Sequence, residues 1–579
     1  MNFFAKMKNR MPSAQNVLFT LVSAVLLIQA FPDFELWLLA WVCLAPFFLA
    51  IEREKSSPAK GFLLGWLWGV AFFFGTCWWL AYAPTHYGGV PAVISYFLVF
   101  CASVAAGLFP ALFAALLSFL LKRFGNRALL AAPFLWTATE FLRFWLTGNN
   151  WNAIAYSQAF NEGINKYAAV GGIYLVGFTI VFANTFIFLL WFLIAKSFLI
   201  SKNGWSFSGF FETVKQQFSN VKQRGYWTFG FLLIFLFQIF IGFQLPGYDK
   251  TSEPFYASPA AFVIAIQPNV PMSGLRYEDW QKLRQRHVEL SESAFDANIE
   301  KFVEAQTAVH SKDETKDKEF YTEFIRKQFN DTAKVVIFPE SPMNFRYERD
   351  PQFRSFVRDF ASHNDSYVLF NSAEPDPKTD RYFNSAVMVN PRGEKIAQYD
   401  KIFLLPFGEY APVPEPLQSL VPTMVGNFSF GTEYDLLPFG EAKGGVMICF
   451  ESHFPNLSRE YAKRGADVLI EMTNDGYLGN TPVLRQHLAS AVFRAIETNR
   501  PVVRVTNVGV TAYINERGEI FDAAESYTEA TRVWKVSKSD GEQTFYVKYG
   551  DWFAYLCSIV SLVLLGLSFR RKEEEESDK

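Results

Sequence analysis

The sequence predicts a bundle of about eight membrane-spanning helices that carries a layered α/β domain. Half of the 579 residues are apolar and 18% are aromatic, a high share for a soluble protein. The first 250 residues are dominated by apolar runs, many of them close to the roughly 20 residues that a helix needs to cross a bilayer. The region after them alternates short runs rich in Val and Ile with helical patterns, as buried strands of an α/β domain do.

The membrane part is expected to hold apolar spans before residue 250 and a last one near the C-terminus. The first run follows "KMKNR" and resembles a signal peptide, but the later runs favour a first helix that stays uncleaved. The fourth run is longer than one crossing requires, so it is either one tilted helix or a helix with a re-entrant piece around Pro110. The predicted spans are 15–31, 34–52, 61–83, 89–121, 128–147, 168–195, 228–247 and 551–569.

Basic residues predict the orientation of these spans. If the N-terminus is cytoplasmic, the cytoplasmic segments hold nearly all of the Lys and Arg, and the short outside loops hold Lys166 and little else. This bias agrees with the positive-inside rule. It places residues 248–550 on the outer face, which in a double-membrane bacterium is the periplasm, and both termini in the cytoplasm. The basic residues on the cytoplasmic side are Lys6, Lys8, Arg10, Arg53, Lys55, Lys60, Lys122, Arg123, Arg127, Lys196, Lys202, Lys215, Lys222, Arg224, Arg570, Arg571 and Lys572.

The chain is therefore expected to have three parts: the helix bundle 1–248, an extracytoplasmic domain 249–545, and a last span with an acidic tail, 546–579. Within the outer domain, 306–333 is expected to be a largely solvated insertion. Helical patterns cover 277–305 and a segment that ends at Gly465. The predicted strands are 261–267, 334–340, 367–373, 384–390, 445–451, 467–473 and 502–508.

Charge and cysteine usage exclude several classes of function. The net charge is −2, so nothing indicates the basic face that nucleic acid requires. The six histidines form no spaced metal motif, and neither a metal nor another cofactor is expected. Four of the five cysteines lie in apolar runs, which makes no disulfide framework. Cys449 is alone in the polar region, where it is either a free reactive thiol or a small buried hydrophobe.

Three motifs place a reactive side chain at or near the end of a predicted strand. "VVIFPES" carries Glu340, "AQYDKIFLLPFGEY" carries Lys401 and Glu409, and "GVMICFES" carries Cys449. Ligands of open α/β sheets collect at the carboxyl ends of strands, so these side chains could share a pocket. Taken singly, Glu340 could instead cap the next turn, and Lys401 could be a surface lysine on a hairpin.

Together, these groups predict an acyl-thioester enzyme that works by double displacement. Glu340 would take the thiol proton as general base, because only the thiolate of Cys449 is a strong nucleophile. Lys401 would stabilise the thiolate and then the oxyanion, with help from backbone N–H groups near Phe450. A pair between Cys449 and His453 is the weaker alternative, because "SHFPN" is typical of a turn.

Two further features leave alternatives open. Glu140 and Arg143 share a face of the fifth span, as a functional pair or as a structural ion pair near the outer interface. The proline-broken segment 412–430 is either a lid that dips into the membrane interface or an ordinary packed loop. The apolar residues that favour the lid are Leu417, Leu420, Val421, Met424, Val425 and Phe428.

The ordered motifs "FPES", "DKIFLLPFGEY" and "GVMICFES" resemble the Glu–Lys–Cys signature of the nitrilase (carbon–nitrogen hydrolase) superfamily. The wider pattern is similar to the apolipoprotein N-acyltransferase family, whose motifs here run nearly the whole chain. They are "TEFLRFWLTGNNW", "IQPNVP", "TNDGYLGN" and "RQHLASAVFRAIETNRPVVRVTNVGVTAYI", within the frame of about eight spans.

This resemblance implies an αββα sandwich on a membrane bundle in the inner membrane, without a cofactor and with nothing that demands more than a monomer. It implies transfer of an acyl chain from a phospholipid, through a cysteine thioester, to the amine of the diacylglyceryl-cysteine of an apolipoprotein. Glu340 would be the base, Lys401 the oxyanion lysine and Cys449 the nucleophile. Glu409 and Glu451 match supporting positions of the family, and Phe450 occupies another. Tyr277 lies one residue away from a position where the family often has Trp, displaced by an apparent insertion.

The sequence departs from the family pattern at three of these motif positions. Phe450 stands where a Tyr is usual, and Tyr477 with Leu478 replaces Trp-Phe in "NDAWFG". These changes affect the expected lipid pocket and leave the three catalytic groups intact. A membrane-tethered amidase acting on a small amide would use the same triad, and a transporter or receptor would not need Cys449.

Overall fold

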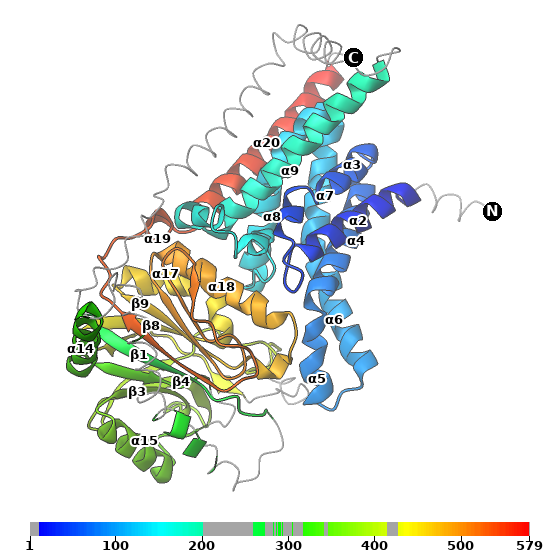
Figure 1. Cartoon of the computed structure of the whole chain (residues 1–579). Coiled ribbons are helices and arrows are strands. Elements are labelled where there is room, and N and C mark those ends of the chain that lie inside the picture. Colours follow the sequence, from blue (N-terminus) through cyan, green and yellow to red (C-terminus); the bar gives the residue numbers. More distant parts are fainter. Residues whose placement is uncertain are drawn as a thin grey trace. The chain divides into compact units, whose positions relative to one another are not determined.

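The computed structural model describes residues 11–200, 259–272, 316–340, 345–413 and 427–577, and single positions between 282 and 304 (Figure 1). The chain divides into two compact units. The helical unit consists of Met1–Trp78, Tyr96–Asp249 and Asp551–Lys579, and the sheet unit consists of Trp79–Ser95 and Lys250–Gly550. The segment Trp79–Ser95 therefore groups with the sheets, although it lies between two apolar helices in the sequence.

Helices of mostly apolar sequence form the helical unit. Those that are apolar all round are typical of helices inside a membrane. In chain order, the helices are α2 Ala14–Gln29, α3 Ala45–Arg53, α4 Pro58–Cys77, α6 Ala92–Ala106, α7 Leu108–Phe124, α8 Ala132–Thr147, α9 Ala168–Ile200 and α20 Trp552–Ser577; α6 begins in the sheet unit.

The predicted number of about eight spans is not confirmed. The predicted span 34–52 is wrong as one helix, because a 3-10 turn and α3 divide it, and Pro46 in the first turn of α3 cannot continue a preceding helix. The run 228–247 lies outside the described residues. Within the described part of the chain, the stretches long and apolar enough to cross a membrane are Pro58–His86, Ala92–Thr147, Asn165–Phe192 and Trp552–Phe569.

The fourth apolar run is two helices, α6 and α7, which meet at Gly107. Pro110 does not break the chain, because it lies in the first turn of α7, where no helical hydrogen bond is lost. The run is therefore helical on both sides of Gly107, whose own φ and ψ are helical, and the choice between one tilted helix and a re-entrant piece around Pro110 stays a prediction.

Glycines allow α4 to lie directly against α7. Gly61, Gly65 and Gly69 recur every fourth residue on α4 and face the backbone of α7. A Cβ atom added at Gly65 would lie 2.7 Å from the Cβ of Ala114 and closer still to the carbonyl oxygen of Pro110. Small residues at this spacing are how helices approach closely inside a membrane, where no hydrophobic effect drives them together.

We expect Gly65→Ala to destabilise the helical unit by roughly 1–3 kcal/mol, because α4 and α7 must separate to admit the methyl group. The measurement is the thermal unfolding midpoint in detergent micelles. Gly566→Ala in α20 is the matched control, since a Cβ atom there meets nothing within 4 Å. Equal midpoints for the two variants would contradict the close approach of α4 and α7.

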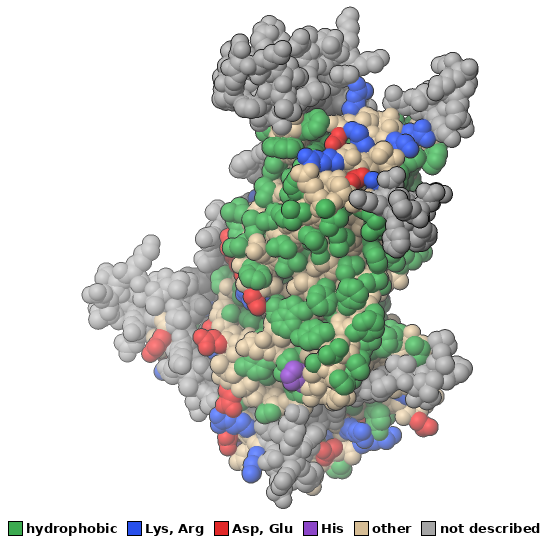
Figure 2. All heavy atoms as spheres, turned by 90° about the vertical axis from the view of Figure 1, so that its right-hand side faces the viewer, with side chains coloured by type: hydrophobic (Ala, Val, Ile, Leu, Met, Phe, Trp, Pro, Cys, Tyr) green, Lys and Arg blue, Asp and Glu red, His purple; other side chains and the backbone are tan. Residues whose placement is uncertain are grey.

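The helical unit exposes a broad apolar surface. Figure 2 shows hydrophobic side chains spread over one face of its helices, with Lys and Arg gathered at one end. Exposed apolar side chains of these helices include Phe97 and Leu108, which are 61% and 50% exposed. Lys60 and Lys122 both flank the contact between Gly61 and Ser118, so the basic segments of α4 and α7 share that end. A surface of this kind suits contact with lipid chains, with the basic end at a headgroup region.

Two sheets packed face to face form the sheet unit. The first has the order β13-β1-β2-β3-β4-β5, with β6 beside β4, and the second has the order β12-β11-β10-β9-β8-β7. The strands that matter most to the site are β2 Lys334–Ile337, β5 Lys395–Asp400 and β8 Ala442–Ile448. The others are β1 Ala261–Gln267, β3 Tyr367–Pro375, β4 Tyr382–Val389, β6 Phe428–Ser429, β7 Leu436–Phe439, β9 Val468–Thr473, β10 Val502–Thr506, β11 Ala512–Ile514, β12 Ile520–Phe521 and β13 Ala530–Val536.

Helices cover the outer face of each sheet (Figure 1). α14 Lys316–Asp331 and α15 Pro351–His363 pack on the first sheet through a core that includes Phe329, Val357 and Phe360. α17 Pro455–Lys463 and α18 Val483–Thr498 pack on the second sheet, followed by the short α19 Phe545–Tyr549. The order helix, sheet, sheet, helix is the αββα sandwich that the resemblance implied.

Part of the predicted solvated insertion 306–333 is wrong. Residues 316–331 form α14, and Ile325 and Phe329 are buried against the first sheet. These two side chains lie four residues apart on one helical face, so a single apolar stripe anchors an otherwise charged helix.

Candidate functional site

Glu340, Lys401 and Cys449 line one pocket in the sheet unit. Glu340 follows β2, Lys401 follows β5 and Cys449 follows β8. β2 and β3 are parallel, and β5 runs the same way as β3 because both are antiparallel to β4, so Glu340 and Lys401 emerge at one edge of the first sheet. The pocket contains about 530 Å³ of space free of protein atoms, part of it open to solvent.

Lys401 lies between two carboxylates. Its Nζ atom is 2.9 Å from Glu409 and 3.7 Å from Oε1 of Glu340, and its side chain is almost fully buried. Burial alone would lower the pKa of Lys401, but the carboxylates of Glu409 and Glu340 raise it above the usual value. The amine is therefore a fixed positive charge inside the pocket.

Asn384 ties the two carboxylates together. Its amide donates to Oε1 of Glu340 at 3.0 Å and to Oε1 of Glu409 at 2.6 Å, and its own oxygen accepts from Asn371 at 2.7 Å. Burial and the nearby charge of Glu409 raise the pKa of Glu340. A carboxylate with a raised pKa accepts a proton readily, as a general base must.

Cys449 is held at a sharp turn. Its φ is +53°, the left-handed region that residues other than glycine seldom adopt, and it begins a 3-10 turn directly after β8. Burial and the charge of Glu340 raise the pKa of its thiol well above the usual value, against the opposing effect of Lys401. Conversely, the thiol of Cys449 acts to lower the pKa of Glu340, against the larger effect of burial. The resting group is thus a neutral thiol in the same pocket as the Glu340 carboxylate.

Glu451 links the backbone segment next to Lys401 to the backbone segment next to Cys449. Its Oε1 atom accepts from the Tyr399 hydroxyl at 2.8 Å and from the N–H groups of Ile402 and Phe403 at 2.7 and 3.0 Å. Its Oε2 atom accepts from the N–H of Ile448 at 2.8 Å. Burial raises its pKa to about 7. Glu451 therefore fixes the distance between the two sheet ends that carry the site.

Of the other residues named from the sequence, some lie at or beside the pocket and one lies outside the described residues. The Phe450 ring packs on His453 and Phe454, with ring centres 5.7 and 5.2 Å away, and is buried beside the pocket. Burial lowers the pKa of His453 well below its usual value, so its ring is neutral. Tyr477 lines the pocket. Tyr277 lies outside the described residues.

The predicted lid can be followed only at its ends. Residues 414–426 lie outside the described residues. At the far end, Phe428 forms β6 against β4 and lines the pocket, and Phe430 is half exposed. Within the parts of the chain that the structure describes, no cluster of His, Cys, Asp and Glu is arranged to hold a metal ion.

Sequence reasoning missed a segment that supports one side of this site. The segment Trp79–Ser95 docks on the turn that carries Tyr477: the Tyr87 hydroxyl donates to the Gly476 carbonyl at 3.2 Å, and the Tyr87 and Tyr477 rings are 6.0 Å apart. The Trp79 indole donates to Gln486 at 3.2 Å. Aromatic and polar residues in "WWLAYAPTHYGG", between two apolar runs, were the available signal.

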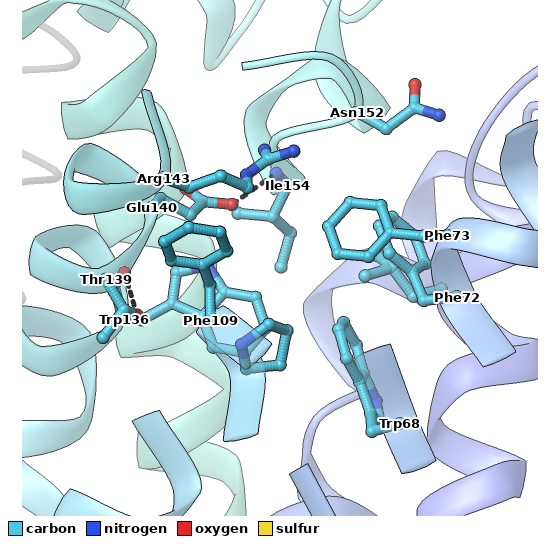
Figure 3. A pocket seen from close by; sticks show the side chains of 12 residues that line it. Trp68, Phe72, Phe73, Phe109, Trp136, Thr139, Glu140, Arg143, Asn152 and Ile154 are labelled. Atoms are coloured by element: carbon cyan, nitrogen blue, oxygen red, sulfur yellow. Dashed lines mark hydrogen bonds between the residues drawn. The ribbon is translucent and has the colours of Figure 1, made fainter. Parts of the chain in front are cut away.

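A second pocket lies within the helical unit (Figure 3) and is lined mainly by side chains of α4, α7 and α8, several of them aromatic. Glu140 accepts from the N–H of Ile154 at 3.0 Å, and Arg143 donates to the carbonyl of Trp151 at 2.9 Å while it covers the Phe73 ring. Both charged groups thus bind the backbone that follows α8. These contacts give the pair a structural part in holding that segment.

Comparison with known proteins agrees with these features. The family model for the apolipoprotein N-acyltransferase N-terminal domain matches residues 23–186, and the carbon-nitrogen hydrolase model matches residues 263–546. The apolipoprotein N-acyltransferase of Geobacter metallireducens is 29% identical over 570 residues, which cover 96% of each chain. The chain belongs to the apolipoprotein N-acyltransferase family.

Other members of this N-acyltransferase family match over similar lengths. The Pasteurella multocida protein is 26% identical over 98% of this chain and 97% of its own. Among solved structures, Saccharomyces cerevisiae Nit3, a member of the nitrilase superfamily, is 18% identical, with a TM-score of 0.34 over 50% of this chain and 93% of its own. The family assignment rests on the family models and the full-length relatives, and it makes the chain a membrane protein with a nitrilase-like domain.

Proposed function

We propose that the protein transfers an acyl chain from a phospholipid to the N-terminal amine of the diacylglyceryl-cysteine of apolipoproteins, through a thioester on Cys449. One observation carries the proposal: a neutral thiol, a carboxylate with a raised pKa and a buried ammonium group share one pocket. The full-length relatives named apolipoprotein N-acyltransferase supply the substrate class.

In the first half-reaction, Glu340 takes the thiol proton as Cys449 attacks the ester carbonyl of the phospholipid. The oxyanion that forms is stabilised by the Lys401 amine and by a backbone N–H next to the nucleophile. When the tetrahedral intermediate collapses, the ester C–O bond breaks. Glu340 then returns its proton to the leaving alkoxide, and lysophospholipid departs.

In the second half-reaction, the amine of the apolipoprotein attacks the thioester and gives a proton to Glu340. The same donors stabilise the second oxyanion. The C–S bond then breaks, the amide product forms, and the proton on Glu340 restores the thiol of Cys449. Glu409 and Asn384 act through the other groups, because they fix Lys401 and Glu340 without facing the bond that breaks.

The finer details of placement belong to the same proposal. The protein lies in the inner membrane as a monomer, with about eight spans, both termini cytoplasmic and the catalytic domain periplasmic. Its parts are 1–248, 249–545 and 546–579. The gathering of basic residues at one end of the helical unit supports this orientation.

The decisive experiment is intact mass of the purified protein after incubation with phospholipid and no acceptor, for the wild type and Cys449→Ala. We expect a gain of one acyl chain that neutral hydroxylamine removes, that maps to Cys449 and that the variant lacks. A diacylated lipopeptide added next should take up the chain. No adduct on folded protein in excess lipid would contradict the phospholipid donor, and release of ammonia from small amides would favour an amidase.

A further inference from the structure

A buried imidazole contacts the backbone of the nucleophile. His487, on α18, is 3% exposed. Its Nδ1 atom is 2.7 Å from Oδ1 of Asp475, and its Nε2 atom is 3.1 Å from the carbonyl oxygen of Cys449. The reaction scheme assigns no role to this residue, although it contacts the peptide group that joins Cys449 to Phe450.

The contacts of His487 define its charge. A carboxylate and a peptide carbonyl can only accept hydrogen bonds, so both ring nitrogens must carry a proton and the ring is an imidazolium. Burial alone would lower the pKa of His487, but Asp475 and Glu471 raise it to about 9 against the opposing charge of Arg504. The ring is therefore charged at neutral pH.

The surrounding charges balance only with that proton in place. Arg504 contacts Glu471 at 2.5 Å and Asp475 at 2.9 Å, and Glu471 lies 3.0 Å from Nε2 of His487. The cluster thus contains two carboxylates, one guanidinium and one imidazolium. Buried charges are tolerated when they are paired in this way.

The nearby ion pair on α18 and the neighbouring His453 ring add no net charge to this cluster. Arg494 of α18 pairs with Glu497 on the same helix at 2.6 Å. His453, whose ring centre is 5.2 Å from that of His487, is neutral. The charges of the cluster therefore sum to zero, and within it the imidazolium of His487 faces the Cys449 carbonyl.

The carbonyl that His487 contacts belongs to the same peptide unit as the N–H of Phe450. The peptide is a planar conjugated group, so a charged donor on its oxygen draws electron density away from its nitrogen. The N–H then becomes a stronger donor, as it must be to stabilise an oxyanion. The same contact supports the left-handed backbone of Cys449, which has an intrinsic cost.

We propose that His487 is a positioning residue that polarises the Cys449–Phe450 peptide, so that the Phe450 N–H opposes Lys401 as a donor to the oxyanion. This inference rests on the proposed function, because it assigns one of the two donors of that mechanism. His487 gains and loses no proton during the reaction. Its effect is confined to steps that pass through an oxyanion.

Two reactions of Cys449 separate this role from a structural one. Acylation by p-nitrophenyl acetate passes through a tetrahedral oxyanion, whereas alkylation by iodoacetamide displaces iodide at a saturated carbon and forms none. In His487→Gln, we expect the acylation rate to fall about tenfold or more, and the alkylation rate to stay within about twofold. The acylation rate is the burst of p-nitrophenolate, and the alkylation rate is the mass gain at Cys449, both on one monodisperse fraction of the whole protein.

His363→Gln is the control, because it makes the same exchange at the exposed end of α15 and should change neither rate. Equal losses of acylation and alkylation in His487→Gln would overturn the proposal, since they would mean only that the thiol is misplaced. Unchanged rates would also overturn it. Failure of phospholipid to acylate the wild type would contradict the proposed function alone, because the p-nitrophenyl ester forms the same oxyanion without lipid.

A second variant tests the charge itself. Asp475→Asn removes the main anion that keeps His487 protonated and so lowers its pKa. The ratio of acylation to alkylation rates should fall as the pH rises through the pKa of His487, which is about 9 in the wild type. In the variant this fall should begin at a lower pH, and a ratio with the same pH dependence as the wild type would overturn the proposal.

Discussion

Replacing Lys401 with methionine is expected to slow acylation of Cys449 by about a hundredfold to a thousandfold. The variant loses an oxyanion donor and also leaves Glu340 and Glu409 without their shared cation in a buried site. Breaking a buried pair in this way costs roughly 3–5 kcal/mol of stability. The rate is measured as hydroxylamine-labile mass at Cys449 with phospholipid in detergent, and stability as the unfolding midpoint.

Lys395→Met is the matched control, because Lys395 begins the same strand and pairs with Glu348 and Glu374, neither of which lines the pocket. Its acylation rate should stay within about twofold. In the double variant Lys401→Met with Glu409→Gln, the stability should recover in part, because one of the two unpaired carboxylates is removed, while acylation stays slow. If the double variant recovered acylation as well, Lys401 would serve only to neutralise Glu409.

Glu340→Gln is expected to slow acylation by about 10²- to 10⁴-fold near neutral pH. Glutamine keeps the size of the side chain and can still accept from Asn384, but it cannot take the thiol proton. Because the charge of Glu340 raises the pKa of the Cys449 thiol, its removal lowers that pKa. The variant should therefore gain thiolate at a lower pH than the wild type and recover part of its acylation rate as the pH rises.

The check is the pH dependence of two rates, acylation by phospholipid and alkylation by iodoacetamide. The alkylation midpoint should move to lower pH in Glu340→Gln and stay in place in Glu348→Gln, a surface control. An acylation rate near the wild-type value at pH 7 would show that another group accepts the proton.

The sequence was sufficient for the part of the site that follows from strand direction. Glu340 and Cys449 follow apolar runs whose ends coincide with β2 and β8, or lie within a few residues of them. Lys401 was placed with them through its motif, because β5, the strand that precedes it, is not among the predicted strands. Asn384 and Asn371 could not be found, since an uncharged amide inside a buried strand gives no signal until its neighbours across the sheet are known.

The membrane part was harder to predict because hydropathy reports composition and not the partner that a side chain faces. The apolar run 34–52 forms short helices, and the run 61–83 ends in residues that pack in the sheet unit. Trp79 lies in a predicted span and Tyr87 in the short loop after it, yet they bond to Gln486 and Gly476 of the sheet unit. Hydropathy predicted that this region consists of apolar helices, but it could not predict where each helix begins and ends.

The segment Trp79–Ser95 limits how this enzyme can be cut or recombined. A fragment that begins at residue 250 would lack the tyrosine that holds the Gly476 carbonyl and the indole bonded to Gln486. We therefore do not expect such a fragment to be an autonomous module, even though residues 263–546 match the carbon-nitrogen hydrolase model. Chimaeras that exchange catalytic domains between relatives should therefore carry 79–95 along with the donor's domain, and two parts expressed as separate chains should assemble only when one of them supplies it.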